Sequence, residues 1–449
     1  MNTSRSSRLT VVLALSAIGA VWSAMAWFSR LEAPWAIRQT SPAFALALAA
    51  TYVAAWAIVV ARSQTPRLAL FRALAATVSG MLGLVVLEMP AAAGIIDYSH
   101  VRGALTGGWQ GPTDDFVTDH ELSFKRPPHA RWAGRPRSNM AQAFNLPLRS
   151  AHRQTFTTDS NGFRNATDMD STDIVLVGDS YVEGAYVSDE ETAAERLHEL
   201  TGERVANLGL SGYGPLQELQ VLEKFGLPLK PHLAAWFFFE GNDLDDDQAY
   251  ENAMAFEHGV RPPAVPEDPG LRWRALLNRS FTMNAFMQLR QTFDPVVPNA
   301  VDSFGWFRDR GGESHRFYFY DFYATRQLGD YERSRFESAK ATFRQANEIC
   351  RARGVKLIVF YVPIKFRVYG DLCTFPAVSP CTRWHPWDLE SQFAAFCREA
   401  GIPYVSITPA MRQAARAGDV VYTPEDSHWS PDGHRLVAGL IRDAEREER

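Results

Sequence analysis

The sequence predicts an α/β fold with a parallel β-sheet, preceded by N-terminal helices that span a membrane. Two observations lead to this prediction. Short apolar, β-branched segments alternate with helical segments after residue 172, and three long apolar runs lie within the first hundred residues. At 449 residues the chain is too long for one ordinary domain, so we expect two or three units.

The apolar runs occupy about residues 9–29, 39–61 and 68–88. Each is about 20 residues long, the length that a helix needs to cross a bilayer. The third run carries Arg72 near its start, from where the side chain can reach the membrane interface. We therefore predict a transmembrane region over residues 1–97 rather than three buried core helices.

Arginines set the predicted orientation of these helices, because basic residues are enriched in cytoplasmic loops. With the N-terminus inside, only Arg30 and Arg38 fall in the short outer loop, whereas the cytoplasmic side carries Arg5, Arg8, Arg62, Arg67 and Arg72. This predicts a multi-pass protein of the inner (cytoplasmic) membrane, with everything after residue 97 on the extracytoplasmic side. Residues 24–26 also resemble a signal-peptidase site; cleavage there would leave two crossings and the same compartment.

The exported part divides into a lead-in segment and a catalytic domain. Residues 98–171 are rich in Gly, Pro, Arg and Asn, with little periodicity, and Asn161-Gly162 indicates a tight hairpin turn. Residues 172–449 carry the alternating pattern, interrupted by a Pro-, Asp- and aromatic-rich insertion at about 244–330. We predict strands at 173–178, 205–208, 232–239, 355–362 and 402–407, and helices at 192–200, 215–225, 334–353, 389–400 and from 431 onward.

Polar residues and glycines follow the predicted strands, which is where catalytic groups collect in an α/β sheet. Ser180 follows the first strand, Gly212 the second and Asn242 the third, while His428 lies beside Asp426 before the last helix. A serine after a strand can simply cap a helix. A histidine next to a carboxylate, however, supplies the base that a serine nucleophile needs. Together these residues predict a serine-dependent enzyme.

Four short motifs at these places closely resemble those of the SGNH (GDSL-like) hydrolase family. They are Gly178–Tyr181 (GDSY), Asn207–Gly214 (NLGLSGYG), Glu240–Asp243 (EGND) and Asp426–Trp429 (DSHW). The resemblance covers about residues 172–448, apart from the insertion. It implies a flavodoxin-like, three-layer domain with a parallel sheet.

The resemblance also implies a role for each residue. Ser180 is expected to be the nucleophile, His428 its base, and Asp426 the acid that orients the imidazole. The backbone N–H groups of Ser180 and Gly212 and the side-chain amide of Asn242 are expected to form the oxyanion hole. Removing one such donor typically costs about 2.7–4 kcal/mol of barrier.

The terminal motif departs from the common family pattern, which is Asp-x-x-His. Here one residue separates Asp426 from His428, and Glu425 occupies the position three before the histidine. The Asp-x-His-Trp form is similar to that of exopolysaccharide O-acetylation proteins, such as those that act on alginate. This favours Asp426 as the triad acid and leaves Glu425 as an alternative.

The sequence implies neither a metal nor an organic cofactor. Asp243–Asp247 is acidic but lacks the glycine and the distal glutamate of a calcium loop, so we predict a solvated turn. His434 is predicted to be structural. The aromatic residues between Phe304 and Tyr323 can either pack the insertion or stack on sugar rings.

All four cysteines lie in the predicted exported part, and their spacings fit no zinc pattern. An oxidising compartment favours disulfides. We predict a bridge between Cys373 and Cys381 across a short Pro-containing segment. Cys350 and Cys397 are a less defined pair on two predicted helices, and four unpaired buried thiols are the alternative.

These expectations combine into an ester hydrolase or O-acyltransferase that works outside the cytoplasm through an acyl-serine intermediate. Compartment and resemblance favour O-acetyl groups on a cell-envelope or secreted carbohydrate as the substrate. Transfer would bring in a membrane-bound acyl-donor protein, whereas the net charge of -5 gives no reason to expect nucleic acid. A lipid esterase or thioesterase, and a non-catalytic scaffold that binds envelope polysaccharide, stay open as alternatives.

Overall fold

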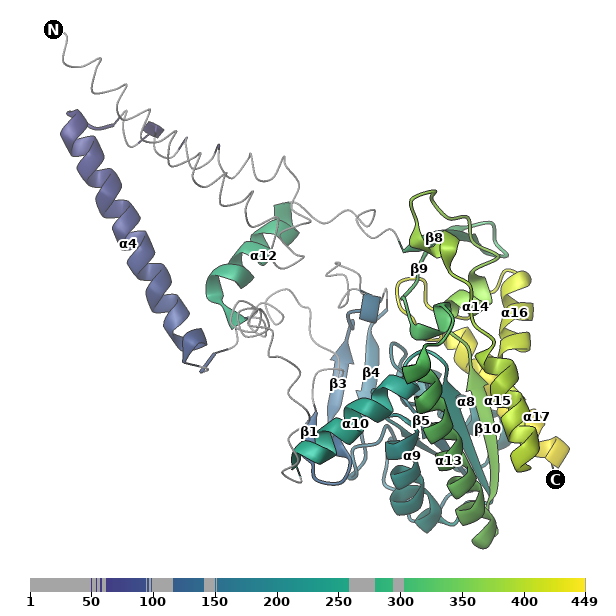
Figure 1. The fold of residues 1–449 in the computed structure, drawn as a ribbon. Coiled ribbons are helices and arrows are strands. Elements are labelled where there is room, and N and C mark those ends of the chain that lie inside the picture. Colours follow the sequence, from purple (N-terminus) through teal and green to yellow (C-terminus); the bar gives the residue numbers. More distant parts are fainter. Residues whose placement is uncertain are drawn as a thin grey trace. The chain divides into compact units, whose positions relative to one another are not determined.

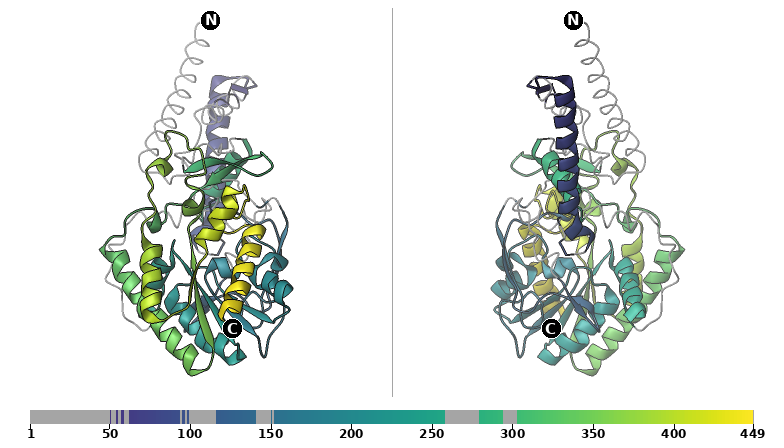
Figure 2. Two further views of the ribbon diagram at one scale, coloured as in Figure 1. Left: turned by 90° about the vertical axis from the view of Figure 1, so that its right-hand side faces the viewer. Right: turned by 90° about the vertical axis from the view of Figure 1, so that its left-hand side faces the viewer.

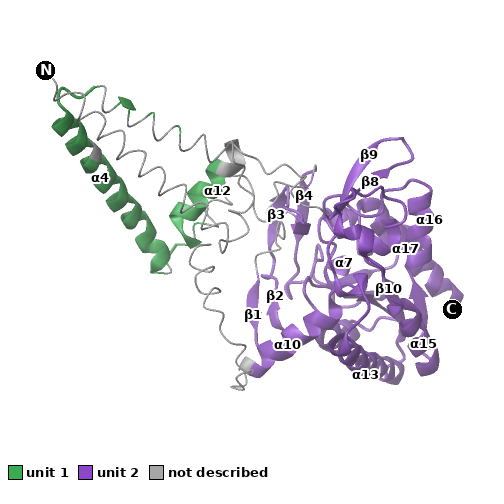
Figure 3. Ribbon diagram, turned by 45° about the horizontal axis from the view of Figure 1, so that its top comes forward, with its two compact units in different colours: residues 1–108, 265–300 green, residues 109–264, 301–449 purple. Residues whose placement is uncertain are grey.

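The computed structural model divides the chain into two compact units, shown in Figure 3. Unit 1 comprises residues 1–108 and 265–300, and unit 2 comprises residues 109–264 and 301–449. The structure describes residues 62–93, 95–96, 116–140, 152–257, 279–293 and 303–448, and the positions 50, 54, 57–58, 98 and 150. Each unit is described by itself below.

Unit 2 is built on a five-stranded parallel sheet with the strand order β11-β10-β7-β5-β6 (Figure 1). Its strands are β5 (Ile174–Gly178), β6 (Val205–Gly209), β7 (Leu233–Phe239), β10 (Lys356–Val362) and β11 (Tyr404–Ser406). All five lie where the sequence predicts them. Every residue of β5, β6 and β7 is buried, as expected for a parallel sheet that is covered on both faces.

Helices cover both faces of this sheet, which gives a three-layer α/β architecture (Figure 2). The helices α8 (Ala193–Thr201) and α17 (Pro431–Glu448) pack together on one face. The other face carries α9 (Pro215–Val221), α13 (Asp330–Ala352) and α15 (Leu389–Ala400). The predicted helices correspond to these five.

Alternating aromatic side chains of β7 join the three layers. Phe237 stacks on Phe360 of β10 and meets Trp429, whereas its neighbour Phe238 stacks on Phe393 of α15. Successive side chains of a strand point to opposite faces of the sheet, so these two adjacent phenylalanines pack against different layers of the fold. The aromatic run at the end of β7 therefore belongs to the core of the strand that the sequence predicts at 232–239.

The lead-in segment forms two small antiparallel pairs. They are β1 (Val117–Asp119) with β2 (Ser123–Lys125), and β3 (Arg131–Gly134) with β4 (Gln154–Thr157). The predicted hairpin at Asn161-Gly162 is wrong. Gly162 does take a positive φ of 89°, but Asp159 organises a turn there by accepting N–H groups from Asn161 and Phe163, and no strand follows it among the described residues.

The segment predicted as an insertion contains regular elements of both units. α10 (Asp243–Glu257) and the hairpin β8 (Phe304–Arg308) to β9 (Ser314–Tyr318) belong to unit 2, and α12 (Phe281–Phe293) belongs to unit 1. α10 replaces the solvated acidic turn that we expected at Asp243–Asp247. Asp243 and Asp247 are fully buried on this helix, where they accept backbone N–H groups of Phe239 and Leu216.

Unit 1 contains α4 (Pro66–Ala92), which is long and apolar enough to cross a bilayer by length and composition. It is the one such helix among the described residues. The predicted run at 68–88 lies within it, whereas the runs at 9–29 and 39–61 lie outside the part of the chain that the structure describes, apart from four positions. The Glu88 carboxylate near the end of α4 accepts the N–H groups of Phe281 and Thr282 at the start of α12.

The predicted disulfide between Cys373 and Cys381 is wrong in this structure, where all four cysteines are free thiols. The backbone beside Cys373 pairs with Trp306, and its Cβ lies against Gly305 of β8, so the residue is held toward the hairpin. Cys350 and Cys397 are also unbridged and buried on α13 and α15. Burial raises the pKa of each of these two thiols to about 12, which favours the protonated form.

Candidate active site

Ser180, His428 and Asp426 form a hydrogen-bonded chain at the carboxyl edge of the sheet. Ser180 Oγ lies 2.8 Å from His428 Nε2, and His428 Nδ1 lies 2.5 Å from Asp426 Oδ1. Asp426 is 2% exposed, so its carboxylate is desolvated behind the imidazole. A hydroxyl, an imidazole and a buried carboxylate in this order are the arrangement that activates a serine for nucleophilic attack.

The sequence places Ser180 through a tight turn between β5 and the short helix α7 (Ser180–Glu183). Asp179 caps this helix by accepting the N–H of Tyr181 at 2.9 Å. Gly209 at the end of β6 makes room for the turn, because a Cβ there would lie 2.3 Å from the Glu183 backbone nitrogen. Glycine is therefore required where the backbone of β6 comes this close to the backbone of α7.

The charges of the site set the protonation of His428. Burial disfavours a charged imidazole, but the carboxylate of Asp426, by its charge and its hydrogen bond, raises the pKa of His428 above its usual value. Burial likewise opposes ionisation of Asp426, yet His428 holds the pKa of this carboxyl below its usual range. The pair is thus built to carry an imidazolium beside a carboxylate, which is the state that forms after proton transfer from serine.

Glu425, the alternative acid, faces away from this chain. Its carboxylate contacts the Tyr186 hydroxyl at 3.4 Å, whereas Asp426 holds both the backbone N–H and the ring of His428. Burial raises the pKa of Glu425, whereas the pKa of Asp426 lies below its usual range. The geometry therefore supports Asp426 as the partner of His428.

The three residues expected to form the oxyanion hole follow three neighbouring strands. Ser180 comes after β5, Gly212 after β6 and Asn242 after β7, so all lie at one edge of the sheet. Gly212 has a φ of 84°, a conformation that favours glycine. The Asn242 side-chain amide donates one hydrogen bond to Asp246 at 2.5 Å, and its second N–H is available for a ligand.

Comparison with known proteins assigns a family to the part of the chain that contains Asp426 and His428. Residues 318–448 match the family described as the SGNH hydrolase-like domain of the acetyltransferase AlgX. Over these residues the chain is similar to the SGNH hydrolase-like domain of this acetyltransferase family. The class of enzyme is accordingly an SGNH-type hydrolase or acetyltransferase.

Several solved structures are similar to the chain that carries this AlgX-type domain. A lipolytic protein of the G-D-S-L family from Desulfitobacterium hafniense is 12% identical with a TM-score of 0.31, covering 61% of this chain and 99% of that one. The lipase/acylhydrolase from Enterococcus faecalis is 17% identical with a TM-score of 0.30, covering 61% and 96%. An acetylxylan esterase from Geobacillus stearothermophilus is 13% identical with a TM-score of 0.31, covering 62% and 95%. No curated protein matches the sequence.

The lead-in segment contributes a residue to the site that no motif or pattern in the sequence indicates. The Asn139 backbone N–H donates to Asp426 Oδ2 at 2.6 Å, so it satisfies the carboxylate oxygen that does not face His428. The Asn139 side-chain oxygen also accepts the Ser427 backbone N–H, and the Asn139 side-chain amide donates to the Ser427 hydroxyl. Asn139 has no motif and no periodic neighbours, so only the folded structure reveals this contact.

A buried ion pair supports the loop that carries Gly212. Arg126, which follows β2, donates two hydrogen bonds to the Glu183 carboxylate at 2.8 and 3.0 Å, and both side chains are almost fully buried. Glu183 in turn accepts the hydroxyl of Ser211. The lead-in segment thus connects the nucleophile helix α7 to the loop after β6.

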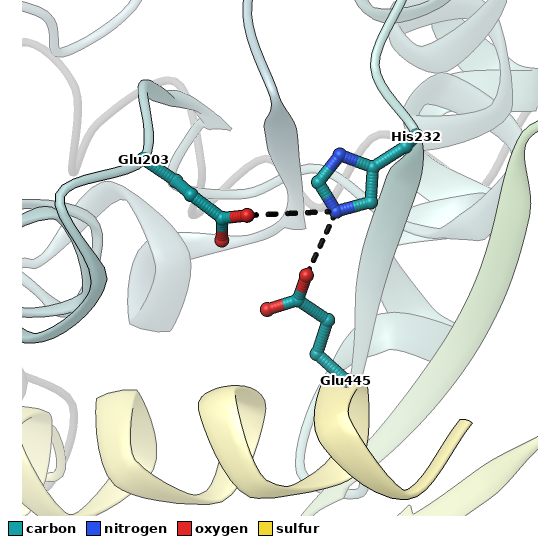
Figure 4. A group of neighbouring side chains, drawn as sticks. All are labelled: Glu203, His232 and Glu445. Atoms are coloured by element: carbon teal, nitrogen blue, oxygen red, sulfur yellow. Dashed lines mark hydrogen bonds and ion pairs between the residues drawn. The ribbon is translucent and has the colours of Figure 1, made fainter. Parts of the chain in front are cut away.

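Two clusters among the described residues have side chains of the types that bind metal ions. One joins Glu203, His232 and Glu445 (Figure 4), of which Glu203 and His232 lie just before the starts of β6 and β7. The other joins Asp309, Glu313 and His315 on the β8–β9 hairpin. In each cluster the histidine Nε2 already contacts a carboxylate at 2.8 Å, so an ion pair accounts for the arrangement. His434, predicted to be structural, is buried on α17 and accepts the Ala193 N–H.

Proposed function

We propose that this protein cleaves or transfers acyl groups through an acyl-Ser180 intermediate, and that its substrate is an O-acetylated carbohydrate. The observation that carries the proposal is the contact from Ser180 Oγ through the His428 ring to Asp426. The match to the AlgX acetyltransferase family supports an acetyl group on a polysaccharide. Binding alone would need no nucleophile with its base, which argues against a purely structural role.

In the proposed first step, His428 Nε2 takes the hydroxyl proton of Ser180 while Oγ attacks the ester carbonyl. The carbonyl oxygen becomes an oxyanion, which the N–H groups of Ser180 and Gly212 and the Asn242 amide would stabilise. Collapse of this intermediate breaks the ester bond, and His428 returns the proton to the leaving alcohol. Asp426 stabilises the imidazolium throughout without taking its proton.

In the second step, a hydroxyl compound attacks the acyl-Ser180 ester and His428 again accepts its proton. The bond between the acyl carbon and Ser180 Oγ then breaks, and His428 returns the proton to Oγ. Water as the acceptor gives acetic acid and free Ser180, whereas a sugar hydroxyl gives a new O-acetyl group and free Ser180. The transfer reaction requires an acyl donor on the same side of the membrane, and we propose a membrane-bound acyl-donor protein for that role. Nothing in this scheme requires a metal ion or an organic cofactor.

We also propose that unit 1 anchors the enzyme in the inner membrane, with the catalytic unit on the extracytoplasmic side. The length and apolar composition of α4 and the distribution of arginines support this location. An extracytoplasmic active site would meet cell-envelope carbohydrate, which agrees with the proposed substrate.

A serine-reactive fluorophosphonate tests the nucleophile directly in the purified full-length protein. We expect covalent labelling of the wild-type protein at Ser180, no labelling of Ser180→Ala, and much slower labelling of His428→Ala. Ser338→Ala, which removes a hydroxyl from α13 instead, is the matched control and should label normally. Labelling that persists in Ser180→Ala and maps to another serine would refute the proposed mechanism.

A further inference from the structure

The loop between Tyr422 and Trp429 carries both Asp426 and His428, yet it has almost no regular structure. Its two ends meet in an isolated antiparallel bridge, and the Thr423 N–H donates to the His428 carbonyl at 3.0 Å. These bonds close the loop but leave the carbonyl groups at its centre to find other partners. The positions of Asp426 and His428 therefore depend on the groups that donate hydrogen bonds to these carbonyls.

Lys365 fills this loop. This residue starts the short helix α14 (Lys365–Tyr369), which follows β10, and its side chain is 3% exposed. Nζ donates to the carbonyl oxygens of Thr423 at 2.8 Å, Pro424 at 2.9 Å and Asp426 at 2.7 Å. An ammonium group has three N–H donors, so these three carbonyls use all of them.

The surroundings of Nζ suit a cation rather than a neutral group. The ring centroids of Phe317 and Phe319 lie 5.2 and 5.6 Å from it, within the range of cation–π attraction. Burial lowers the pKa of Lys365 to about 7, and the negative charges of Asp426 and Glu425 oppose this shift. A neutral amine would have only two N–H donors and would leave one of the three carbonyls without its hydrogen bond.

We propose that Lys365 is a positioning residue of the active site, whose ammonium group holds the 423–428 loop so that His428 meets Ser180. The inference rests on the proposed function, because it concerns the same serine and histidine. Within the described residues, Lys365 Nζ donates to neither Ser180 nor the His428 ring, and it acts through three backbone carbonyls. A displacement of about 1 Å in such a catalytic group can lower the rate by about a hundredfold.

Lys365→Met tests this inference, because methionine keeps much of the side-chain volume and removes the donors and the charge. We expect kcat for an aryl acetate to fall about a hundredfold in the full-length protein while KM stays unchanged, the pattern of a group that aligns reacting atoms. Labelling of Ser180 by the fluorophosphonate should slow in parallel. The matched control is Lys340→Met, which removes a lysine that pairs with Glu337 on α13 and should leave both parameters unchanged.

The outcomes separate positioning from folding and from substrate contact. An unchanged kcat in Lys365→Met would overturn the inference, and so would a raised KM with kcat intact, which would indicate substrate binding instead. If Lys365→Met does not fold, as judged by thermal unfolding, Lys365→Gln keeps a donor and takes its place under the same criteria. Loss of folding in both variants would make Lys365 a residue required for stability and would also overturn a positioning role. An inactive wild-type protein would refute the proposed function rather than this inference.

Discussion

The single bond between His428 Nδ1 and Asp426 Oδ1 decides most of the chemistry at the residue scale. It fixes which ring nitrogen faces Ser180, and it raises the pKa of the imidazole. Glu425 stands next in the sequence but faces the Tyr186 hydroxyl. Two adjacent carboxyl groups thus have different partners, and mutations can distinguish them.

Asp426→Asn should lower kcat by about 10⁴-fold, because the amide favours the wrong imidazole tautomer and cannot stabilise the imidazolium. Glu425→Gln should cost far less, since the Tyr186 contact lies outside the proton-transfer chain. Steady-state hydrolysis of an aryl acetate by both variants gives the comparison. A larger loss in Glu425→Gln would assign the triad acid to the other residue.

The pH dependence of kcat/KM should report the shifted His428. The base must be neutral to accept a proton, so activity should rise with pH and reach half its plateau above the usual histidine pKa of about 6.5. Removing the negative charge of Asp426 destabilises the imidazolium, so the residual activity of Asp426→Asn should have its midpoint at lower pH. A midpoint that does not move, or moves upward, would contradict the role given to this carboxylate.

The elements around the site show what sequence patterns can and cannot predict. Continuous apolar runs identified β5, β7 and β10, because a strand that is buried on both faces has apolar residues at successive positions. α10 was missed, since its acidic residues suggested a solvated turn while two of them are buried by tertiary contacts. Asn139 binds the Asp426 carboxylate and Lys365 binds backbone carbonyls of the 423–428 loop, both far away in the sequence, and such pairs leave no periodic signal. Ser180, Asp426 and His428 could be identified from the sequence, because each lies in a motif of four consecutive residues.

The Arg126–Glu183 pair should be essential to the stability of the elements that it joins. Arg126→Met leaves the Glu183 carboxylate buried without its cation, and we expect a loss of about 3–5 kcal/mol in unfolding free energy. The double variant with Glu183→Gln removes the uncompensated charge and should recover part of that loss. Denaturant unfolding of the wild-type protein, of Arg126→Met and of the double variant measures these free energies of unfolding.

Arg435→Met is a suitable control for this experiment. It breaks a pair with Asp432 in which both side chains are more than half exposed, so its cost should be about 0–1 kcal/mol. A cost for Arg126→Met no larger than that of the control would show that the buried pair is not needed for stability.

At the scale of the whole molecule, we predict that the chain after residue 97 lies on the extracytoplasmic side of the membrane. Alkaline phosphatase fused after residue 100 should be active, because the arginine distribution places that point outside the cytoplasm. A fusion at about residue 64, between the second and third predicted runs, should be stable and inactive. The reverse pattern of activities would invert the proposed topology.

The division of the chain into its two units has a further consequence. Unit 1 takes residues 1–108 and 265–300, so the polypeptide passes between the units three times, at about residues 108, 264 and 300. A protease that cuts at about residue 108 removes the covalent link to residues 1–108, and the catalytic unit then stays attached only through residues 265–300, which belong to unit 1. If unit 1 is embedded as proposed, release of the catalytic unit after such a cut also requires residues 265–300 to leave unit 1.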